Sequence, residues 1–167
     1  MDLKNFNLEP FNILDKEWAL LTAGNKDKFN TMTISWGGFG TIWHKPVVTV
    51  YVRPNRYTYE FIENSDYFTI SFFDEKFKDD LAVLGSKSGR DLNKLALTKI
   101  TPNFVEKGIS FDESYLTIVC KKIYFQDINL ENIIPEEREN ISLKLFNNQP
   151  VHRMYIGEVV EIIDGRK

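Results

Sequence analysis

Apolar and polar residues alternate over several stretches of this chain, and the alternation predicts a protein built mainly of β-strands. The clearest stretches are residues 31–36, 47–52, 67–73 and 154–163. Apolar side chains at every second position favour a strand with one buried face and one exposed face. A shorter apolar run over residues 18–22 leads through Ala23-Gly24 into a charged segment at 25–28, which indicates a strand followed by a hairpin turn.

Local irregularities refine this pattern. Over residues 115–125 the apolar positions change phase at Lys121-Lys122, and a β-bulge at that point would explain the shift. Gly157 lies inside the last strand, where we expect a bend or a close approach of another segment. The glycine-rich segment 37–40 breaks the alternation after the strand at 31–36.

Helical signals are fewer and shorter than strand signals. Asn55 is a candidate N-cap for a helix over residues 56–63, and residues 77–84 and 90–95 are candidates for one or two helical turns. The polar segment 129–140 predicts a loop or a short helix. Because a closed or nearly closed antiparallel barrel protects strand edges, we expect a mainly β barrel with helical insertions, forming a single domain over residues 1–167.

Composition excludes several classes of function. A chain of 167 residues can bury a core without disulfide or metal support. Its 21 basic and 24 acidic residues give a net charge of −3, without the positive bias of a nucleic-acid-binding protein. Cys120 is the only cysteine and the sequence has 2 histidines, so we expect no internal disulfide and no metal site.

Targeting signals are equally sparse. No apolar run is long enough to span a membrane, and the N-terminus lacks the pattern of a signal peptide. Together with the single unpaired cysteine, this leads us to expect a cytoplasmic protein with no membrane partner.

Aromatic residues make up 14% of the chain, which further favours strands.

The segment from Asn30 to Gly38 is the first that could carry chemistry. It packs Asn, Thr and Ser into a strand that contains Trp36 and ends in glycine. Glycine lets a flat ring approach the backbone, and the hydroxyl and amide groups could bind its heteroatoms. An ordinary strand running into a hairpin is the alternative, and the glycines do not follow a dinucleotide-binding pattern.

Two further segments could bind an anion. Arg53 and Arg56 flank the expected start of a helix, with Thr58 close behind, and guanidinium groups together with free N–H groups suit a phosphate. Solvent-exposed arginines are the alternative. The run from Gly85 to Asp91 combines small residues with Lys87 and Arg90, as in a backbone nest for an anion, although a solvated loop would have the same composition.

His152 precedes the last strand, and a lone histidine is more often structural than catalytic. No Ser-His-Asp, Cys-His or paired-carboxylate arrangement can be assembled from the sequence.

Taken together and in order, these segments resemble the flavin reductase-like family, which has the FMN-binding split-barrel fold and includes the flavoredoxins. The matching segments are residues 18–24, 30–38, 45–46, 53–54, 56–61, 68–73, 88–91 with Lys94, and 152–158. The resemblance implies a six-stranded antiparallel Greek-key split barrel with short helical insertions. It also implies a homodimer with FMN near the subunit interface.

Residue roles follow from the same resemblance. The isoalloxazine ring and ribityl chain would contact Asn30, Thr31, Met32, Thr33, Ser35 and Trp36. The phosphate would contact Arg53, Arg56, Tyr57, Thr58 and Tyr59, with further cofactor contacts from Ser86, Lys87, Ser88 and Arg90. His152 and Tyr155 would face the nicotinamide or substrate and serve as catalytic residues.

Three functions remain open at this point. The first is a reductase that passes hydride from NADH or NADPH to FMN, with electrons going on to a redox protein or a flavin-accepting partner. The second is a flavoredoxin-type carrier that holds FMN and exchanges electrons with a protein. The third is a barrel that binds a planar ligand without turnover. No discrete nicotinamide-binding motif separates the first from the second.

Overall fold

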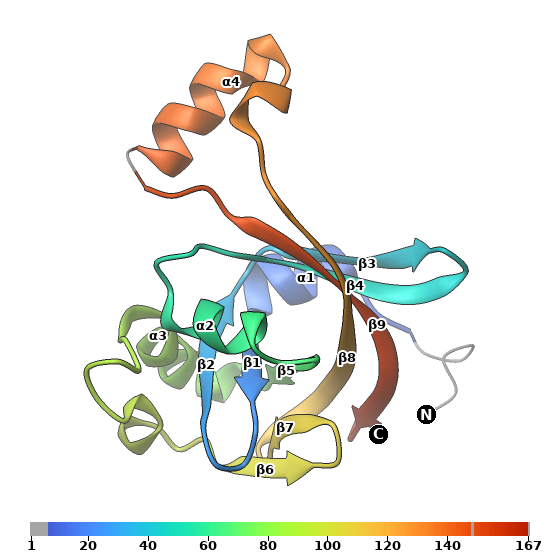
Figure 1. Ribbon diagram of the computed structural model, residues 1–167. Helices are drawn as coiled ribbons and strands as arrows, with labels where there is room; N and C mark the ends of the chain where they lie inside the picture. The colour runs from blue at the N-terminus through green and yellow to red at the C-terminus, as the bar shows by residue number, and fades with distance from the viewer. Residues whose placement is uncertain (1–6, 148, 167) are drawn as a thin grey trace.

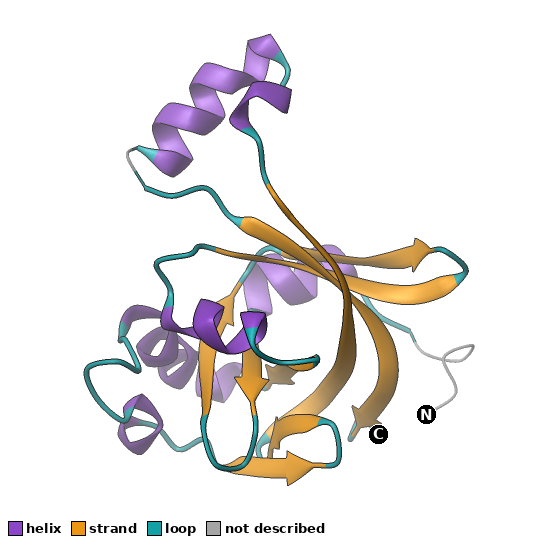
Figure 2. Cartoon of the chain, in the orientation of Figure 1, coloured by secondary structure: helices purple, strands orange, loops and turns teal. Residues whose placement is uncertain are grey.

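A large antiparallel sheet dominates the computed structural model, which describes residues 7–147 and 149–166 (Figures 1 and 2). Within these residues, seven strands form one sheet in the order β2-β1-β5-β8-β9-β4-β3, and β6 pairs with β7 in a separate hairpin. The strands are β1 (Ala19–Gly24), β2 (Phe29–Ile34), β3 (Gly37–Ile42), β4 (Lys45–Val52), β5 (Tyr67–Phe73), β6 (Pro102–Val105), β7 (Gly108–Phe111), β8 (Ser114–Asp127) and β9 (Arg153–Asp164). The prediction of a mainly β chain is confirmed.

Short helices fill the connections between strands (Figure 2). The α-helices are α1 (Pro10–Asn12), α2 (Tyr57–Glu63), α3 (Lys78–Ser86) and α4 (Pro135–Ile141). Single helical turns are η2 (Ile13–Glu17), η3 (Glu75–Phe77), η4 (Lys94–Leu97), η5 (Leu130–Asn132) and η6 (Ser142–Phe146). In the described part of the chain, no helix is both long and apolar enough to cross a membrane.

The predicted number of six strands is wrong, because the described residues contain seven strands in the main sheet and two more in the hairpin. The glycine-rich segment was expected to break the pattern, yet it forms β3 and pairs with β4 along its whole length. Backbone hydrogen bonds hold this pairing and need no alternation of side chains. A Cβ atom at Gly37 would lie 2.7 Å from the backbone oxygen of Thr49, so the close approach of the strands requires glycine there.

The core lies on both faces of strand β5. Phe68, Ile70 and Phe72 point into one cluster with the other strands of the barrel, as the alternation predicts. On the opposite face, the Ser71 and Thr117 hydroxyls form a buried hydrogen bond of 2.8 Å between β5 and β8. This second face is buried as well, so the hydroxyl groups on it form hydrogen bonds with each other rather than with water.

Both irregularities predicted in the last strands are present. The pairing of β8 with β9 shifts register on either side of Lys121, which confirms the bulge. At Gly157, an added Cβ would lie 2.5 Å from Cζ of Phe68 and 2.6 Å from Cβ of Cys120. The predicted close approach at Gly157 is therefore confirmed.

Helix α2 begins within one residue of the predicted position, but Asn55 does not cap it. Arg56 occupies the cap position without a side-chain cap, and its N–H donates to the carbonyl of Arg53 to close the preceding turn. The Asn55 amide instead donates to Oε1 of Gln149 at 3.2 Å. The prediction of Asn55 as the N-cap is wrong because a backbone turn takes over that role.

Strands β8 and β9 separate after the pair Asp127 and Arg153, and the chain between them projects away from the sheet (Figure 1, orange). We call residues 128–147 and 149–152 the arm. It contains η5, α4 and η6, in agreement with the loop or short helix predicted for residues 129–140. The arm returns toward the sheet at His152, whose carbonyl accepts a hydrogen bond from the N–H of Ile128.

Candidate functional site

A groove made of three adjoining cavities runs past the ends of β2 and β4. The central cavity has a volume of about 300 Å³. It is lined by Met32, Thr33, Ile34, Ser35, Trp36, Tyr51, Arg53, Asn55, Arg56, Gln149 and His152. Residues from β2, β4, the turn before α2 and the arm therefore meet in one place, although they are far apart in the sequence.

A smaller cavity of about 80 Å³ adjoins the central one at Met32, Asn55 and Arg56. Its remaining lining is mostly hydroxyl, amide and amine groups, from Asn30, Tyr57, Thr58, Ser86, Lys87, Ser88, Gly89 and Lys94. We call this the polar end of the groove.

The third cavity, of about 380 Å³, adjoins the central one at Ser35, Trp36, Tyr51 and His152. It is lined mainly by apolar groups, from Pro10, Phe11, Leu14, Gly37, Ile128 and Phe146, together with Asp15. We call this the apolar end of the groove.

Hydrogen bonds fix the side chains of the polar end. The buried amide of Asn30 donates to Oγ1 of Thr58 at 2.7 Å, which ties β2 to α2. Nη2 of Arg56 donates to the carbonyl of Gly85 at 2.5 Å. Nζ of Lys94 donates to the carbonyl of Leu84 at 2.7 Å. These contacts hold two cations near the end of α3.

The polar end carries positive charge that has no salt-bridge partner in the part of the chain that the structure describes. Burial, with a smaller contribution from the charge of Arg53, lowers the pKa of Arg56. Burial and the charge of Arg56 lower the pKa of Lys94 to about 8. Across the described residues, no carboxylate forms a salt bridge with Arg56, Lys87 or Lys94. An anion placed among these groups would be attracted by each of them.

Aromatic rings surround His152 at the junction of the central cavity and the apolar end. Its ring centroid lies 5.3 Å from that of Trp36 and 5.8 Å from that of Phe146. Burial and the charge of Arg53 lower the pKa of His152 to about 4. The imidazole is therefore neutral at pH 7, where it can donate and accept hydrogen bonds but carries no charge.

The structure brings most of the predicted site residues to this groove. Those that line one of the three cavities are Asn30, Met32, Thr33, Ser35, Trp36, Arg53, Arg56, Tyr57, Thr58, Ser86, Lys87, Ser88 and His152. The predicted groups around a ring and around an anion thus lie in adjoining parts of one groove.

Thr31 and Arg90 lie elsewhere. The Thr31 hydroxyl is buried, donates to the carbonyl of Leu21 and accepts from Thr22, so it is engaged between β1 and β2 and lines none of the three cavities. Arg90 forms a salt bridge with Glu60 and lies 5.0 Å from the ring centroid of Tyr57. Neither residue lines the groove in this structure, and the cofactor contact predicted for each stays a prediction.

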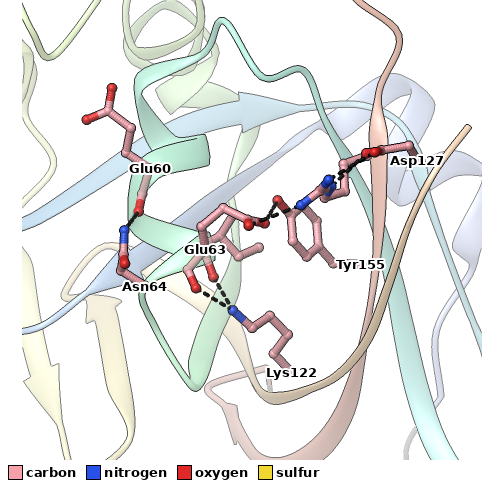
Figure 3. A network of polar contacts seen from close by, with 8 residues as sticks. Glu60, Glu63, Asn64, Lys122, Asp127 and Tyr155 are labelled. Carbon is pink, nitrogen blue, oxygen red and sulfur yellow. Dashed lines mark hydrogen bonds and ion pairs between the residues drawn. The ribbon is translucent and has the colours of Figure 1, made fainter.

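Tyr155 and Tyr59 also lie outside the groove. Tyr155 is fully buried, and its hydroxyl donates to Oε1 of Glu63 at 2.5 Å (Figure 3). Arg153 joins the same network by donating to Glu63 and, through two nitrogens, to Asp127. The Tyr59 ring lies 6.4 Å from that of Tyr155. The prediction that Tyr155 faces a substrate is therefore corrected: it joins α2 to β9.

Sequence reasoning missed Tyr51, Lys94 and Gln149 as lining residues. Tyr51 lies between the buried Val50 and Val52, and this alternation could have placed it on the opposite face. Lys94 falls within the matching segments but had no assigned role. Gln149 belongs to the arm, whose return path to the groove leaves no signal in the sequence.

Comparison with known proteins places this fold in a family. Residues 14–166 match the sequence model of the flavin reductase like domain. No curated protein matches the chain. Several solved structures share its fold at identities too low to indicate more than the fold.

A flavoredoxin from Methanosarcina acetivorans is 19% identical with a TM-score of 0.67, over 89% of this chain and 68% of that one. The FMN-binding protein from Thermus thermophilus with bound 1-cyclohex-2-enone is 17% identical with a TM-score of 0.70, over 99% and 80%. The flavoredoxin of Desulfovibrio vulgaris (Miyazaki F) is 22% identical with a TM-score of 0.67, over 98% and 75%. Since the family model spans nearly the whole chain, this protein belongs to the flavin reductase like domain family.

Proposed function

We propose that this chain binds FMN in the three-part groove and acts as an oxidoreductase that passes hydride from NADH or NADPH to the bound flavin. The observation that carries the proposal is the gradient along the groove. Cations and hydroxyls line one end, polar and aromatic side chains line the middle, and apolar side chains line the other end. The phosphate of FMN would lie at the polar end and its ribityl chain and ring in the central cavity, which leaves the apolar end for a second reactant.

The donor set of the polar end fits a phosphate group. Arg56 and Lys94 supply charge, and Thr58, Ser86 and Ser88 supply hydroxyls around the same cavity. Charge-assisted hydrogen bonds from such groups are about twice as strong as neutral ones. The positive charge left without a carboxylate partner at this end supports an anionic ligand.

The central cavity suits the flavin ring. Its volume of about 300 Å³ lies at the lower limit of ordinary small-molecule sites, and the adjoining cavities extend it. Thr33 in β2 and Ser35 just after it bring hydroxyl side chains to the cavity, and Trp36 offers a ring at the edge. When bound there, FMN supplies the hydride-accepting chemistry, and this chain's residues bind and orient it.

The apolar end supports a reductase rather than a site for flavin alone. Beyond the central cavity it leaves about 380 Å³ beside Trp36 and His152, enough for a second planar group. A neutral His152 can hydrogen-bond the amide of a nicotinamide without repelling it. Positioning two reactants side by side is the main contribution that protein residues make to hydride transfer.

The structural neighbours agree with flavin binding and keep one alternative open. The Thermus thermophilus protein is named as FMN-binding, and two other neighbours are named flavoredoxins. A flavoredoxin-type carrier would receive electrons from a protein donor, whereas the reductase would receive them from NADH or NADPH. In either case electrons would pass on to a redox protein or a flavin-accepting partner.

We also propose that the chain functions as a homodimer. Phe11 is 91% exposed, Ile134 is 62% exposed and Trp43 is 58% exposed, and a second copy of the chain could cover such apolar side chains. The projecting arm offers a further surface that a second copy could cover (Figure 1). Analytical ultracentrifugation should show a flavin-bound species of twice 19.5 kDa at micromolar concentration. A flavin-bound monomer alone would contradict the proposal.

Anaerobic absorption spectroscopy tests the proposed reaction. Protein loaded with FMN should show the yellow flavin spectrum and bleach within seconds after NADH or NADPH is added. A yellow protein that ignores both nucleotides but is bleached by a reduced redox protein would be a carrier. A protein that takes up no FMN would contradict both functions and leave a barrel for another planar ligand.

A further inference from the structure

Arg153 begins β9 at the base of the arm, where β8 and β9 separate. It faces Asp127, the last residue of β8, and the two form the final pair of these strands. Nε and Nη2 of Arg153 donate to the two carboxylate oxygens of Asp127 at 2.6 and 2.9 Å, and Nη1 donates to Oε2 of Glu63 at 3.1 Å. Because Glu63 ends α2, one guanidinium joins β8, β9 and α2 (Figure 3). We call Asp127, Arg153 and Glu63 the root of the arm.

Two aromatic rings also hold this guanidinium. The guanidinium carbon of Arg153 lies 4.9 Å from the ring centroid of Phe125 in β8 and 5.6 Å from that of Tyr59 in α2. A cation within about 6 Å of a ring centroid is attracted by the ring. Arg153 therefore has a carboxylate and a ring as partners on each of the two neighbouring elements, and its side chain is only 19% exposed.

The root is better suited to fixing local geometry than to stabilising the whole fold. The carboxylate of Asp127 is 60% exposed, and ion pairs with so exposed a partner contribute little to stability. A guanidinium and a carboxylate that share two hydrogen bonds restrict each other's orientation. The pair of Arg153 with Asp127 therefore sets the direction in which the two strands leave the sheet and enter the arm.

The outer part of the arm gives it little support. None of the residues of α4 is buried, and the helix projects away from the sheet (Figure 1). Nearer the groove, the amide of Asn55 donates to Oε1 of Gln149 at 3.2 Å, and the guanidinium carbon of Arg53 lies 5.8 Å from the ring centroid of Phe146. These contacts and the root together hold the arm against the groove.

His152 lies one residue away from the root. Its carbonyl accepts a hydrogen bond of 3.0 Å from the N–H of Ile128, the residue that follows Asp127. Its ring centroid lies 5.3 Å from that of Trp36, and both Ile128 and His152 line the apolar end of the groove. A change in the direction of the strand ends would therefore move His152, although Arg153 itself lines none of the three cavities.

We propose that Arg153 is a positioning residue, which fixes the root of the arm on Asp127 and Glu63 and thereby keeps the ring of His152 beside Trp36. It acts through His152 and touches neither reactant. Its effect on the reaction rests on the proposed function, in which His152 orients the nicotinamide. FMN binding does not depend on Arg153, because the phosphate and the ring would lie at the polar end and in the central cavity.

Proton NMR of the histidine rings tests the positioning without any flavin. The His152 ring lies beside the rings of Trp36 and Phe146, whose ring currents shift its signals away from those of a free imidazole. His44 is exposed in the turn between β3 and β4 and serves as the internal reference. In Arg153→Met, the His152 signals should move toward those of a free imidazole, while the His44 signals stay in place.

Arg166→Met is the matched control. Arg166 forms the same double hydrogen bond with Asp164, from Nε at 2.9 Å and from Nη2 at 2.7 Å, but it does so at the other end of β9. It lines none of the three cavities of the groove. The His152 signals of Arg166→Met should therefore match those of wild type, whatever stability this variant loses.

Stopped-flow reduction of bound FMN by NADH measures the consequence for the reaction. Because a displacement of about 1 Å in a positioning group can cost about 100-fold in rate, Arg153→Met should slow reduction about 10- to 100-fold. Its FMN affinity should stay near that of wild type. Adding Arg153→Met to His152→Ala should slow reduction no further, since two changes that act through one residue are not additive.

Two results would overturn the inference: wild-type His152 signals in Arg153→Met, or the same slowing by Arg153→Met whether or not His152 is present. If Arg153→Met does not fold, Asp127→Ala tests the same root, because it removes two of its hydrogen bonds from an exposed position. Asp127→Ala should move the His152 signals in the same direction, and wild-type signals in this variant would refute the role of Arg153.

The two readouts separate this inference from the proposed function. If wild type takes up no FMN, yet Arg153→Met moves the His152 signals and Arg166→Met does not, the proposed function fails and the positioning role stands. If NADH reduces bound FMN equally fast in wild type and Arg153→Met, with equal His152 signals, the proposed function stands and the role of Arg153 fails.

Discussion

Arg56 connects the central cavity with the polar end of the groove, so its replacement tests whether an anion binds there. The side chain lines both cavities and is about half buried. Alanine at this position removes the guanidinium and leaves the backbone turn with Arg53 in place. The expected result is a selective loss of affinity for ligands that carry a phosphate.

The size of the loss follows from one charge-assisted hydrogen bond. Such a bond to phosphate contributes about 1.5–3 kcal/mol. Since about 1.4 kcal/mol corresponds to a tenfold change in affinity, Arg56→Ala should weaken FMN binding roughly 10- to 100-fold. Riboflavin has the same ring without the phosphate, so its affinity should hardly change.

Stability of the flavin-free protein should change little. Removing Arg56 leaves the carbonyl of Gly85 without its hydrogen bond, which costs about 1 kcal/mol. It also removes a cation from the start of α2, where positive charge is unfavourable by about 0.3–1 kcal/mol. These effects oppose each other, so the free energy of unfolding should stay within about 1 kcal/mol of wild type.

The assay is a set of fluorescence titrations with FMN and riboflavin on wild type, Arg56→Ala and Arg90→Ala. Arg90 is the matched control, because it carries the same charge nearby but is paired with Glu60 and lines none of the three cavities. Only Arg56→Ala should lose FMN affinity. Equal losses for FMN and riboflavin would show that Arg56 shapes the groove as a whole, and the phosphate assignment would be wrong.

Three further substitutions separate structural from functional residues. Tyr155→Phe removes the hydrogen bond to Glu63 and should lower the free energy of unfolding by about 1.5–3 kcal/mol in urea melts, without slowing flavin reduction; a slower reaction at unchanged stability would restore Tyr155 to the site. His152→Ala should slow anaerobic reduction by NADH in stopped-flow measurements and leave FMN affinity nearly unchanged, whereas loss of flavin would make His152 a structural residue. The wild-type rate should show no titration near pH 6.5, because the His152 pKa is lowered to about 4. Gly157→Ala should cost about 1–3 kcal/mol of stability by pressing on Phe68, and an unchanged melting curve would contradict that packing.

The sequence predicts the strands of this fold best where burial follows a simple period. The segment 67–73 coincides with β5, because its alternating Phe and Ile residues pack into one cluster. The alternation does not predict β3, because its glycine-rich segment pairs with β4 through the backbone and has no apolar side chain at every second position. The hairpin of β6 and β7 is short and was missed for a similar reason, since its two strands have four residues each.

The candidate site shows the same limit at the level of side chains. Motif residues such as Asn30, Arg56 and His152 reach the groove because β2, the turn before α2 and the segment that leads into β9 lie side by side there. Tyr155 lies only three residues beyond His152, yet it points into the core. The face of the sheet to which a side chain points depends on how its strand pairs with the neighbouring strands. A sequence motif does not give that register, so it cannot say which of its side chains reach the groove.

The central claim is that the groove binds FMN, and a stoichiometric titration tests it most directly. Trp36 lines both the central cavity and the apolar end, so its fluorescence should be quenched when FMN binds. We expect saturable quenching with one FMN per chain, and most of this quenching should be lost in Trp36→Phe while FMN uptake by equilibrium dialysis persists. Absence of FMN uptake by the wild-type protein, or quenching that does not saturate, would contradict FMN binding in the groove.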